Sequence, residues 1–183
     1  MILEKRDAFS LQTLQNLPAA GEAAPMLREY AAQLPVYRGA MKLACTKLEV
    51  LDDEFRMNYG RAPVHHIESR IKSPESILRK MRRKDLPLTV EALRAGVRDI
   101  AGIRVVCAYI NDIYCLAEML LKQEDVTLLR RRDYIVSPKE SGYRGLHLLI
   151  AVPVHLAARR ETVPVEIQLR TIAMDSWASL EHE

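Results

Sequence analysis

The period of the hydrophobic pattern changes near residue 100, and this change restricts the possible folds more than any other feature of the sequence. From Met26 to about Tyr59, apolar residues recur at helical spacing, with a break expected near Pro35. Beyond residue 100, a helical segment over 112–122 lies among four segments typical of strands, which are 101–109, 127–136, 143–154 and 163–171. Helices followed by a strand–helix–strand unit predict an α/β (α+β) domain in which helices flank a mixed β-sheet of about five strands.

Two shorter helices ahead of the strands are marked by their first residues. Ser73 is a natural N-cap and is followed by Pro74, which suits the first helical position. Thr89 is placed to cap a second short helix that runs through Ala95. A last helix is expected from about Ala173, after the final strand.

The chain length of 183 residues suits a single domain, which we place at residues 26–183 after a loosely ordered lead-in at 1–25. No apolar run approaches the roughly 18 residues that a membrane span needs, and the N-terminus lacks the layout of a secretory signal. The three cysteines show no metal-ligand spacing, which is typical of free thiols in a reducing compartment. We therefore expect a cytoplasmic protein with no membrane partner.

The positive charge is concentrated in one part of the chain. The whole chain has a formal net charge of only +3, which does not suggest a general nucleic-acid binder. From Arg70 to Arg104, however, ten Lys and Arg residues stand against four Asp and Glu residues. Such a concentration indicates either a polyanionic partner or a solvated helix face.

The helix that begins after Ser73 carries its cations on one side. Ser76, Lys80 and Lys84 stand at i, i+4 and i+8, and Lys72 lies just before the helix, where free backbone N–H groups already favour an anion. This pattern fits a phosphate-binding helix. A basic helix exposed to solvent is the alternative.

The last expected strand has one polar face. Strand alternation places Glu166, Gln168 and Arg170 together, opposite apolar residues. An acid, an amide and a guanidinium in line fit a substrate site, although a solvated sheet surface has the same pattern.

The preceding strand repeats this arrangement with different chemistry. Alternation there places Tyr143, Gly145 and His147 in line, after a polar loop that contains Lys139. An aromatic ring beside a glycine predicts a stacking surface with a clearing for a ligand.

Asp99 opens the first strand of the second half of the chain. An acid at a strand end beside a basic region is a candidate Mg²⁺ ligand, because Mg²⁺ is commonly held by one or two carboxylates together with substrate phosphates. A loop or capping role is the alternative.

Together and in this order, these segments resemble the synthetase domain of the RelA/SpoT family, and in particular the stand-alone small alarmone synthetases. The likeness covers roughly residues 37–182. It rests on five segments, which are 70–80, 99–104, 132–135, 140–147 and 165–171.

The resemblance implies a nucleotidyltransferase-like synthetase fold and a binding site for ATP. By position, Arg70 and Arg104 correspond to the arginines that sandwich the adenine, a role that suits the flat guanidinium group. Lys72, Ser76 and Lys80 correspond to the residues that hold the ATP phosphates.

The resemblance also implies the metal and acceptor positions. Asp99 corresponds to the Mg²⁺ ligand, Glu166 to the residue that binds Mg²⁺ or activates the acceptor hydroxyl, and Tyr143 to the tyrosine that stacks on guanine. The residues that correspond to positions orienting substrate phosphates and ribose are Lys139, His147, Gln168 and Arg170.

The activity that the resemblance implies is transfer of the β,γ-pyrophosphate of ATP to the ribose 3′-hydroxyl of GDP or GTP, giving ppGpp or pppGpp and AMP. No His-Asp pair of the family's hydrolase domain occurs in the sequence, so synthesis without hydrolysis is expected. Small relatives continue into C-terminal helices that help to build a tetramer. A homo-oligomer is therefore expected, with those helices missing from residues 26–183.

Two other functions remain open at this point. Some small relatives transfer pyrophosphate to the 3′ end of tRNA or to adenosine nucleotides, and the tyrosine surface favours guanine without excluding those acceptors. A non-catalytic nucleotide- or RNA-binding module is the second alternative. Asp99 and Glu166 argue against it, because a binder has no need for both carboxylates, and no stable nucleic-acid complex is expected.

Overall fold

The computed structural model describes residues 2–4 and 21–180. Most of the expected lead-in, residues 5–20, and the segment 181–183 lie outside the described residues. The strands are β1 (Ile2–Glu4), β2 (Val64–Ile71), β3 (Ala101–Cys107), β4 (Thr127–Asp133), β5 (Leu146–His155) and β6 (Arg160–Thr171). The helices are α2 (Ala24–Ala31), α3 (Leu34–Tyr59), α4 (Pro74–Arg83), α5 (Val90–Gly96), α6 (Ile110–Leu121) and α7 (Ile172–Leu180).

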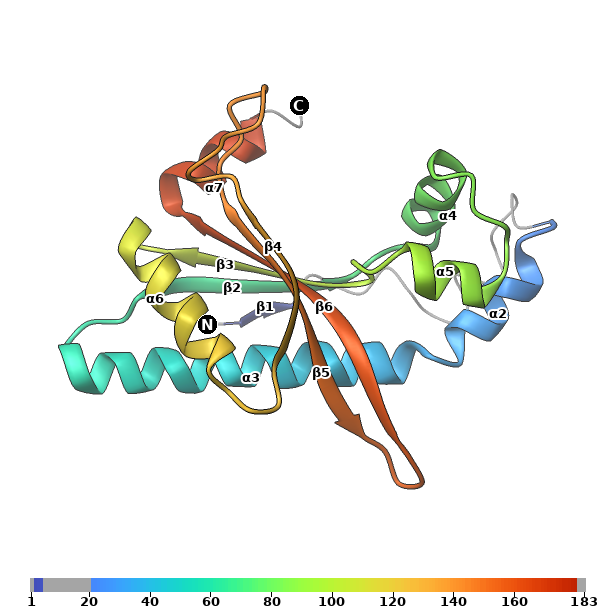
Figure 1. The fold of residues 1–183 in the computed structure, drawn as a ribbon, viewed down its shortest axis with the longest axis horizontal. Helices are drawn as coiled ribbons and strands as arrows, with labels where there is room; N and C mark the ends of the chain where they lie inside the picture. Colours follow the sequence, from blue (N-terminus) through green and yellow to red (C-terminus); the bar gives the residue numbers. More distant parts are fainter. Residues whose placement is uncertain (1, 5–20, 181–183) are drawn as a thin grey trace.

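The strands form one mixed sheet in the order β1-β2-β3-β6-β5-β4 (Figure 1). β1 runs parallel to β2, and β3 runs parallel to β6. The pairs β2–β3, β5–β6 and β4–β5 are antiparallel. The predicted α/β class and mixed sheet are confirmed: five strands have seven residues or more, and the three-residue β1 adds a sixth.

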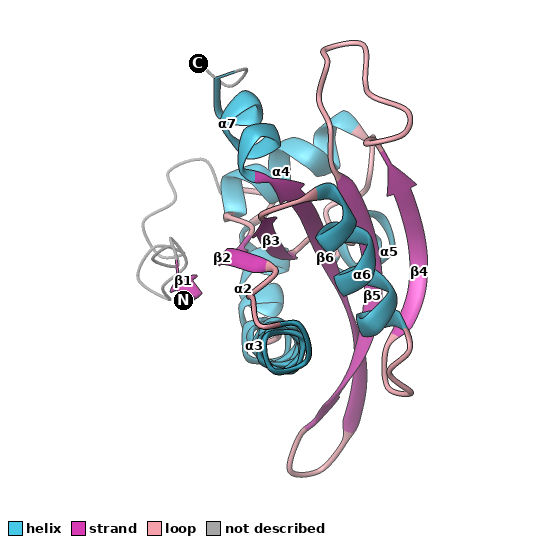
Figure 2. Cartoon of the chain, turned by 90° about the vertical axis from the view of Figure 1, so that its left-hand side faces the viewer, coloured by secondary structure: helices cyan, strands magenta, loops and turns pink. Residues whose placement is uncertain are grey.

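The two faces of the sheet have different roles. The long helix α3 packs along one face with α6, against apolar side chains such as Ile67, Ile103 and Ile167 (Figures 1 and 2). These three isoleucines are almost fully buried and lie on the same face: Ile103 pairs with Ile167 of β6, and Ile67 pairs with Val105, two residues along β3 from Ile103. The opposite face carries the polar side chains and contacts α7, so the candidate site lies there.

The helix boundaries follow the predicted signals. Pro35 lies in the first turn of α3, where it separates this helix from α2. At the start of α4, the Ser73 hydroxyl accepts a hydrogen bond from the Ser76 backbone N–H at 3.3 Å. Thr89 caps α5 in the same way, with a 3.2 Å bond from the Ala92 N–H. Among residues 21–180, no helix is long and apolar enough to cross a membrane.

Two strands, β1 and β2, were not predicted, and one begins later than predicted. β2 was missed because its sequence, VHHIESRI, has only two large buried apolar residues, Ile67 and Ile71, and its other positions are mostly polar. β5 begins at Leu146, so Tyr143 and Gly145 lie in the loop before it.

We expect Leu48→Ala to lower the free energy of unfolding by about 2–5 kcal/mol, because truncating a fully buried leucine leaves a cavity. Leu48 of α3 is 0% exposed, whereas Val50 on the same helix is 58% exposed. Val50→Ala is therefore the matched control and should change stability by less than about 0.5 kcal/mol. Urea denaturation followed by circular dichroism measures both. Equal losses in the two variants would contradict the assignment of the core face.

Candidate active site

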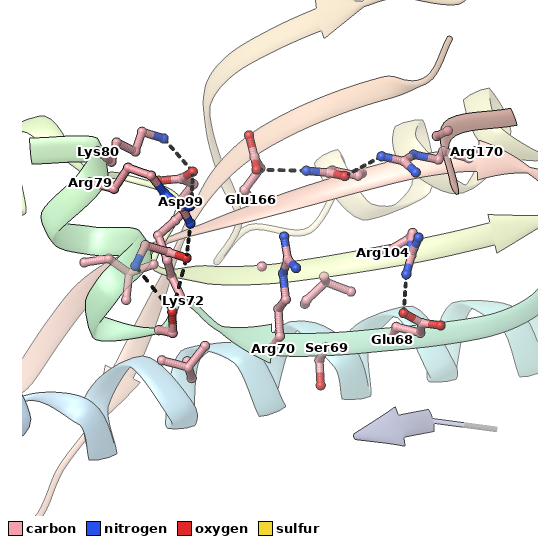
Figure 3. A pocket seen from close by; sticks show the side chains of 18 of the residues that line it. Glu68, Ser69, Arg70, Lys72, Arg79, Lys80, Asp99, Arg104, Glu166 and Arg170 are labelled. Carbon is pink, nitrogen blue, oxygen red and sulfur yellow. Dashed lines mark hydrogen bonds and ion pairs between the residues drawn. The ribbon is translucent and has the colours of Figure 1, made fainter. Parts of the chain in front are cut away.

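A pocket of about 940 Å³ opens on the polar face of the sheet (Figure 3). β2, β3 and β6 form its floor, α4 forms one wall, and α7 borders it through Ala178 and Ser179. The structure brings nine of the predicted site residues into its lining, which are Arg70, Lys72, Ser76, Lys80, Asp99, Arg104, Glu166, Gln168 and Arg170.

Strand register explains why the floor is open between its charged side chains. Arg70 on β2 pairs with Gly102 on β3, and Gly102 pairs with Glu166 on β6. A Cβ atom at Gly102 would meet only the Arg70 carbonyl oxygen, at 3.8 Å. Gly102 therefore leaves space between the guanidinium of Arg70 on β2 and the carboxylate of Glu166 on β6, the two strands beside β3.

Asp99 is held between two lysines at one end of the pocket (Figure 3). Its Oδ2 accepts hydrogen bonds from Lys72 Nζ at 2.9 Å and from Lys80 Nζ at 2.5 Å. Burial alone raises the pKa of Asp99, but the hydrogen bonds and charges of the two lysines outweigh it, and the pKa lies below its usual value. Asp99 is therefore ionised at neutral pH.

The remaining oxygen of Asp99 fits a metal ligand. Asp99 Oδ1 is buried and has no hydrogen-bond partner among the described residues. Glu166 supplies a second carboxylate to the same pocket. The described residues contain no cluster of three or more His, Cys, Asp or Glu residues able to hold a metal. Two carboxylates in a pocket lined by cations suit Mg²⁺, which dehydrates reluctantly and is bound jointly with substrate phosphates.

The first turn of α4 adds hydrogen-bonding groups to the same end. The Ser76 hydroxyl accepts hydrogen bonds from the Ser73 hydroxyl and from Arg79 Nη2, both at 3.1 Å. The helix dipole makes this end favourable for an anion. Arg79 and Arg83 also line the pocket, although the sequence analysis gave them no role.

Lys84 does not belong to this group. Its Nζ donates a 2.7 Å hydrogen bond to the Gly96 carbonyl at the end of α5, and it does not line the pocket. The expectation that Lys84 shares the cationic face with Ser76 and Lys80 was wrong, because α4 ends at Arg83 and the chain turns there.

Arg104 is fixed at the other end of the pocket by two acids. Its guanidinium forms ion pairs with Glu68, which is opposite it on β2, and with Asp175 of α7 at 2.8 Å. Burial lowers the pKa of Arg104, but the hydrogen bond and charge of Glu68 and the charge of Asp175 raise it overall. Arg70, two residues beyond Glu68 on the same face of β2, is exposed in the pocket.

Glu166 lies between the two ends of the pocket. Its Oε2 accepts a 3.1 Å hydrogen bond from Gln168 Nε2, and its Oε1 lies 3.8 Å from His147 Nδ1. Burial on its own raises the pKa of Glu166, yet the interactions with His147 and Gln168 bring it below its usual value. Glu166 is therefore ionised at neutral pH and available as a proton acceptor or metal ligand.

Tyr143, Lys139 and His147 form a separate cluster beside the pocket. The Tyr143 hydroxyl lies 2.6 Å from His147 Nε2 and accepts a 3.1 Å hydrogen bond from Arg170 Nε. Lys139 Nζ lies 4.5 Å from the centre of the Tyr143 ring, which is only 7% exposed. A Cβ at Gly145 would come within 3.2 Å of the Tyr143 hydroxyl. The side chain of Tyr143 therefore fills the space beside Gly145 that was predicted to be open for a ligand.

Two acids in the site had no assigned role in the sequence analysis. Glu68 and Asp175 orient arginines that line the pocket, but neither had a sequence signal linking it to them. Glu68 lies in the unpredicted β2, and Asp175 is an ordinary first-turn acid of α7. Their roles become visible only when the sheet register and the docking of α7 are known.

This pocket, built on the polar face of a mixed sheet, has the cations and paired carboxylates of a site for nucleotide phosphates. A family model described as the region found in RelA / SpoT proteins matches residues 69–183. The chain therefore belongs to the RelA/SpoT family, which confirms the resemblance inferred from its motifs.

Curated relatives from Bacillus subtilis (strain 168) are similar over most of the chain. GTP pyrophosphokinase YwaC is 42% identical over 158 residues, covering 86% of this chain and 75% of the relative. GTP pyrophosphokinase YjbM is 37% identical over 156 residues, covering 85% of this chain and 72% of the relative.

Among the similar solved structures are small alarmone synthetases from Bacillus subtilis. Small alarmone synthetase 2 aligns with a TM-score of 0.75 and 43% identity, over 84% of this chain and 78% of that one. Small alarmone synthetase 1 bound to its product pppGpp gives a TM-score of 0.78 and 37% identity, over 85% and 80%. The structure of small alarmone synthetase 1 bound to AMPCPP aligns with a TM-score of 0.70 and 31% identity, over 85% of this chain and 76% of that one.

We expect Asp99→Asn to lower the free energy of unfolding at pH 7 by about 1–3 kcal/mol, because it leaves Lys72 and Lys80 without their shared carboxylate. The lowered pKa of Asp99 means that its stabilisation is present above the unfolded-state pKa, near 3.9, and is lost as pH falls through the lower folded-state pKa. The difference between wild type and variant should therefore shrink below about pH 4.

Urea titrations at pH 7, 5 and 3 measure this difference. Asp53→Asn, which changes an exposed acid of α3, is the control and should have little effect at any pH. A difference for Asp99→Asn that stays constant from pH 7 to pH 3 would show that the charge of Asp99 does not stabilise the fold.

Proposed function

We propose that this chain transfers the β,γ-pyrophosphate of ATP to the ribose 3′-hydroxyl of GDP or GTP, giving ppGpp or pppGpp and AMP. The observation that carries the proposal is the lysine-bound Asp99, with one buried free oxygen, in the same pocket as the ionised Glu166. The names of the similar proteins, GTP pyrophosphokinases and small alarmone synthetases, support it.

In this proposal ATP lies along the floor of the pocket. Lys72, Ser76 and Lys80 bind its phosphates at the start of α4, where the helix dipole adds to their attraction. Arg70 and Arg104 stack on the adenine, with Arg104 already held in place by its two acids. The volume of about 940 Å³ is large enough for a nucleoside triphosphate.

The acceptor nucleotide is proposed to lie on the side of Tyr143. Guanine stacks on the Tyr143 ring, which requires Lys139 to move from the face that it covers at 4.5 Å. Lys139 is exposed and its side chain is flexible, so it can then reach an acceptor phosphate. His147, Gln168 and Arg170 orient the ribose and phosphates between this ring and Glu166.

The reaction forms a bond between the ribose 3′-oxygen and the β-phosphorus of ATP and breaks the bond from that phosphorus to the α,β-bridging oxygen. AMP leaves with that oxygen, and the proton of the 3′-hydroxyl passes to Glu166. Such transfers depend on positioning and on neutralising charge, which explains a pocket with many cations and few acids.

Asp99 Oδ1 and Glu166 are the residues that would hold Mg²⁺. When bound, Mg²⁺ neutralises charge on the phosphates. Lys72 and Lys80 keep Asp99 ionised and oriented for this ligand.

Other expectations from the sequence stay predictions. They are synthesis without hydrolysis, a cytoplasmic location and a homo-oligomer. The division of the chain into a lead-in at 1–25 and a synthetase domain at 26–183 also stays a prediction.

The test is incubation of the purified chain with ATP, Mg²⁺ and either GDP or GTP, with separation of the products by ion-exchange chromatography. We expect a guanosine product that carries the transferred pyrophosphate, together with an equal amount of AMP. Glu166→Gln should lower the rate by about 10²–10⁴-fold, the usual contribution of a proton-transfer group. Glu161→Gln changes another acid of β6 that is bound to Arg94 and Arg159 outside the pocket, and should leave the rate unchanged.

Near-normal activity of Glu166→Gln would remove Glu166 from this role. If AMP forms only when tRNA or an adenosine nucleotide is supplied, that molecule and not a guanosine nucleotide is the acceptor. Tight nucleotide binding with no turnover on any acceptor would favour a binding module.

A further inference from the structure

Asp175, in the first turn of α7, contacts two arginines that point to different parts of the site. Its Oδ1 accepts a 2.8 Å hydrogen bond from Arg104 Nη1 and a 3.1 Å hydrogen bond from Arg170 Nη1. The Asp175 side chain is 18% exposed, and its two partners are 24% and 10% exposed. These are mostly buried, charge-assisted bonds, which are stronger and more directional than surface ion pairs.

The first partner belongs to the donor side of the pocket. Arg104 is opposite Glu68 on the neighbouring strand and forms an ion pair with it. Glu68 and Asp175 therefore hold the guanidinium from two directions. The side chain of Arg104 is therefore already ordered before a nucleotide binds. A base that stacks on its flat guanidinium group does not have to order it, so binding costs less conformational entropy.

The second partner belongs to the acceptor side. Arg170 donates through Nε to the Tyr143 hydroxyl at 3.1 Å, and its guanidinium carbon lies 4.9 Å from the centre of that ring. Through Nη2 it donates to Gln168 Oε1 at 2.9 Å, and Gln168 in turn donates to Glu166 (Figure 3). The position of Arg170 thus affects both the tyrosine ring and the carboxylate proposed to accept the proton.

We propose that Asp175 is a positioning residue that fixes the donor-side Arg104 and the acceptor-side Arg170 at once, so that one carboxylate on α7 sets the geometry of both nucleotide sites. The roles of the two sides rest on the proposed function. Asp175 does not need to touch either nucleotide, because it acts through the two guanidinium groups. Docking of α7 against β3 and β6 then completes both sites together, and α7 is part of the active site.

The structure offers a matched comparison for this role. Glu68 forms an ion pair with Arg104, whereas Arg170 is bonded to Tyr143, Gln168 and Asp175. Glu68→Gln should therefore weaken the donor site alone, whereas Asp175→Asn should weaken both sites. Both substitutions keep the size of the side chain and remove one charge.

The experiment measures dissociation constants by calorimetry for a non-hydrolysable ATP analogue and, separately, for GDP, each with Mg²⁺. We expect Asp175→Asn to weaken the binding of each nucleotide about five-fold, because two charge-assisted hydrogen bonds become neutral ones. Asp175→Ala should weaken both further. Glu68→Gln should weaken the ATP analogue about five-fold and leave GDP unchanged.

Several results would overturn the proposal. They are unchanged dissociation constants for both nucleotides in Asp175→Ala, weakening of only one of them, or a lower melting temperature with the remaining folded protein binding both nucleotides normally. The last result would assign Asp175 a structural role alone. Because binding is measured without turnover, a wild-type chain that binds both nucleotides but forms no product would contradict the proposed function and leave this test valid.

Discussion

The shared ion pairs of Asp99 with Lys72 and Lys80 are the interaction on which the site depends. They connect three segments that are separate in the sequence: the residue after β2, the cationic side of α4 and the short segment before β3. The Lys72 backbone N–H also bonds to the Ile100 carbonyl at 2.9 Å, so the same junction is fixed twice. Two cations on a single carboxylate oxygen leave a local excess of positive charge and one free oxygen. The positive charge suits a phosphate chain, and the free carboxylate oxygen suits the metal ion bound with it.

The sheet sets the position of this junction relative to the other residues of the site. Its apolar face is buried under α3 and α6, so the strand register is fixed by packing, and a shift of one residue would bury the charged set instead. With that register, Arg70, Gly102 and Glu166 lie in one row. The acids that orient the arginines then come from outside this row, one from β2 and one from α7. Packing of the apolar face thus fixes the positions of the side chains on the polar face, which carry the proposed chemistry.

The sequence predicted those features that depend on local pattern. Apolar periodicity located α3 and the four strands from β3 to β6, and caps such as Ser73 located α4. The ordered motifs identified nine residues that the structure brings into the pocket. β2 was missed because most of its residues are polar, with Glu68 and Arg70 lining the pocket, so it lacks the hydrophobic signal of a strand. The burial of Tyr143 and the bonds of Asp175 depend on contacts between distant segments, which no local pattern encodes.

The central claim is that Asp99, Lys72 and Lys80 bind the phosphates of ATP together with a metal ion. A crystal structure of the chain with a non-hydrolysable ATP analogue and Mn²⁺ tests it, because the anomalous signal of Mn²⁺ locates the metal independently of the nucleotide. We expect one Mn²⁺ within coordinating distance of Asp99 Oδ1, with the β- and γ-phosphates against Lys72 and Lys80. An analogue bound outside this pocket, or a metal bound to the phosphates away from Asp99, would contradict the account.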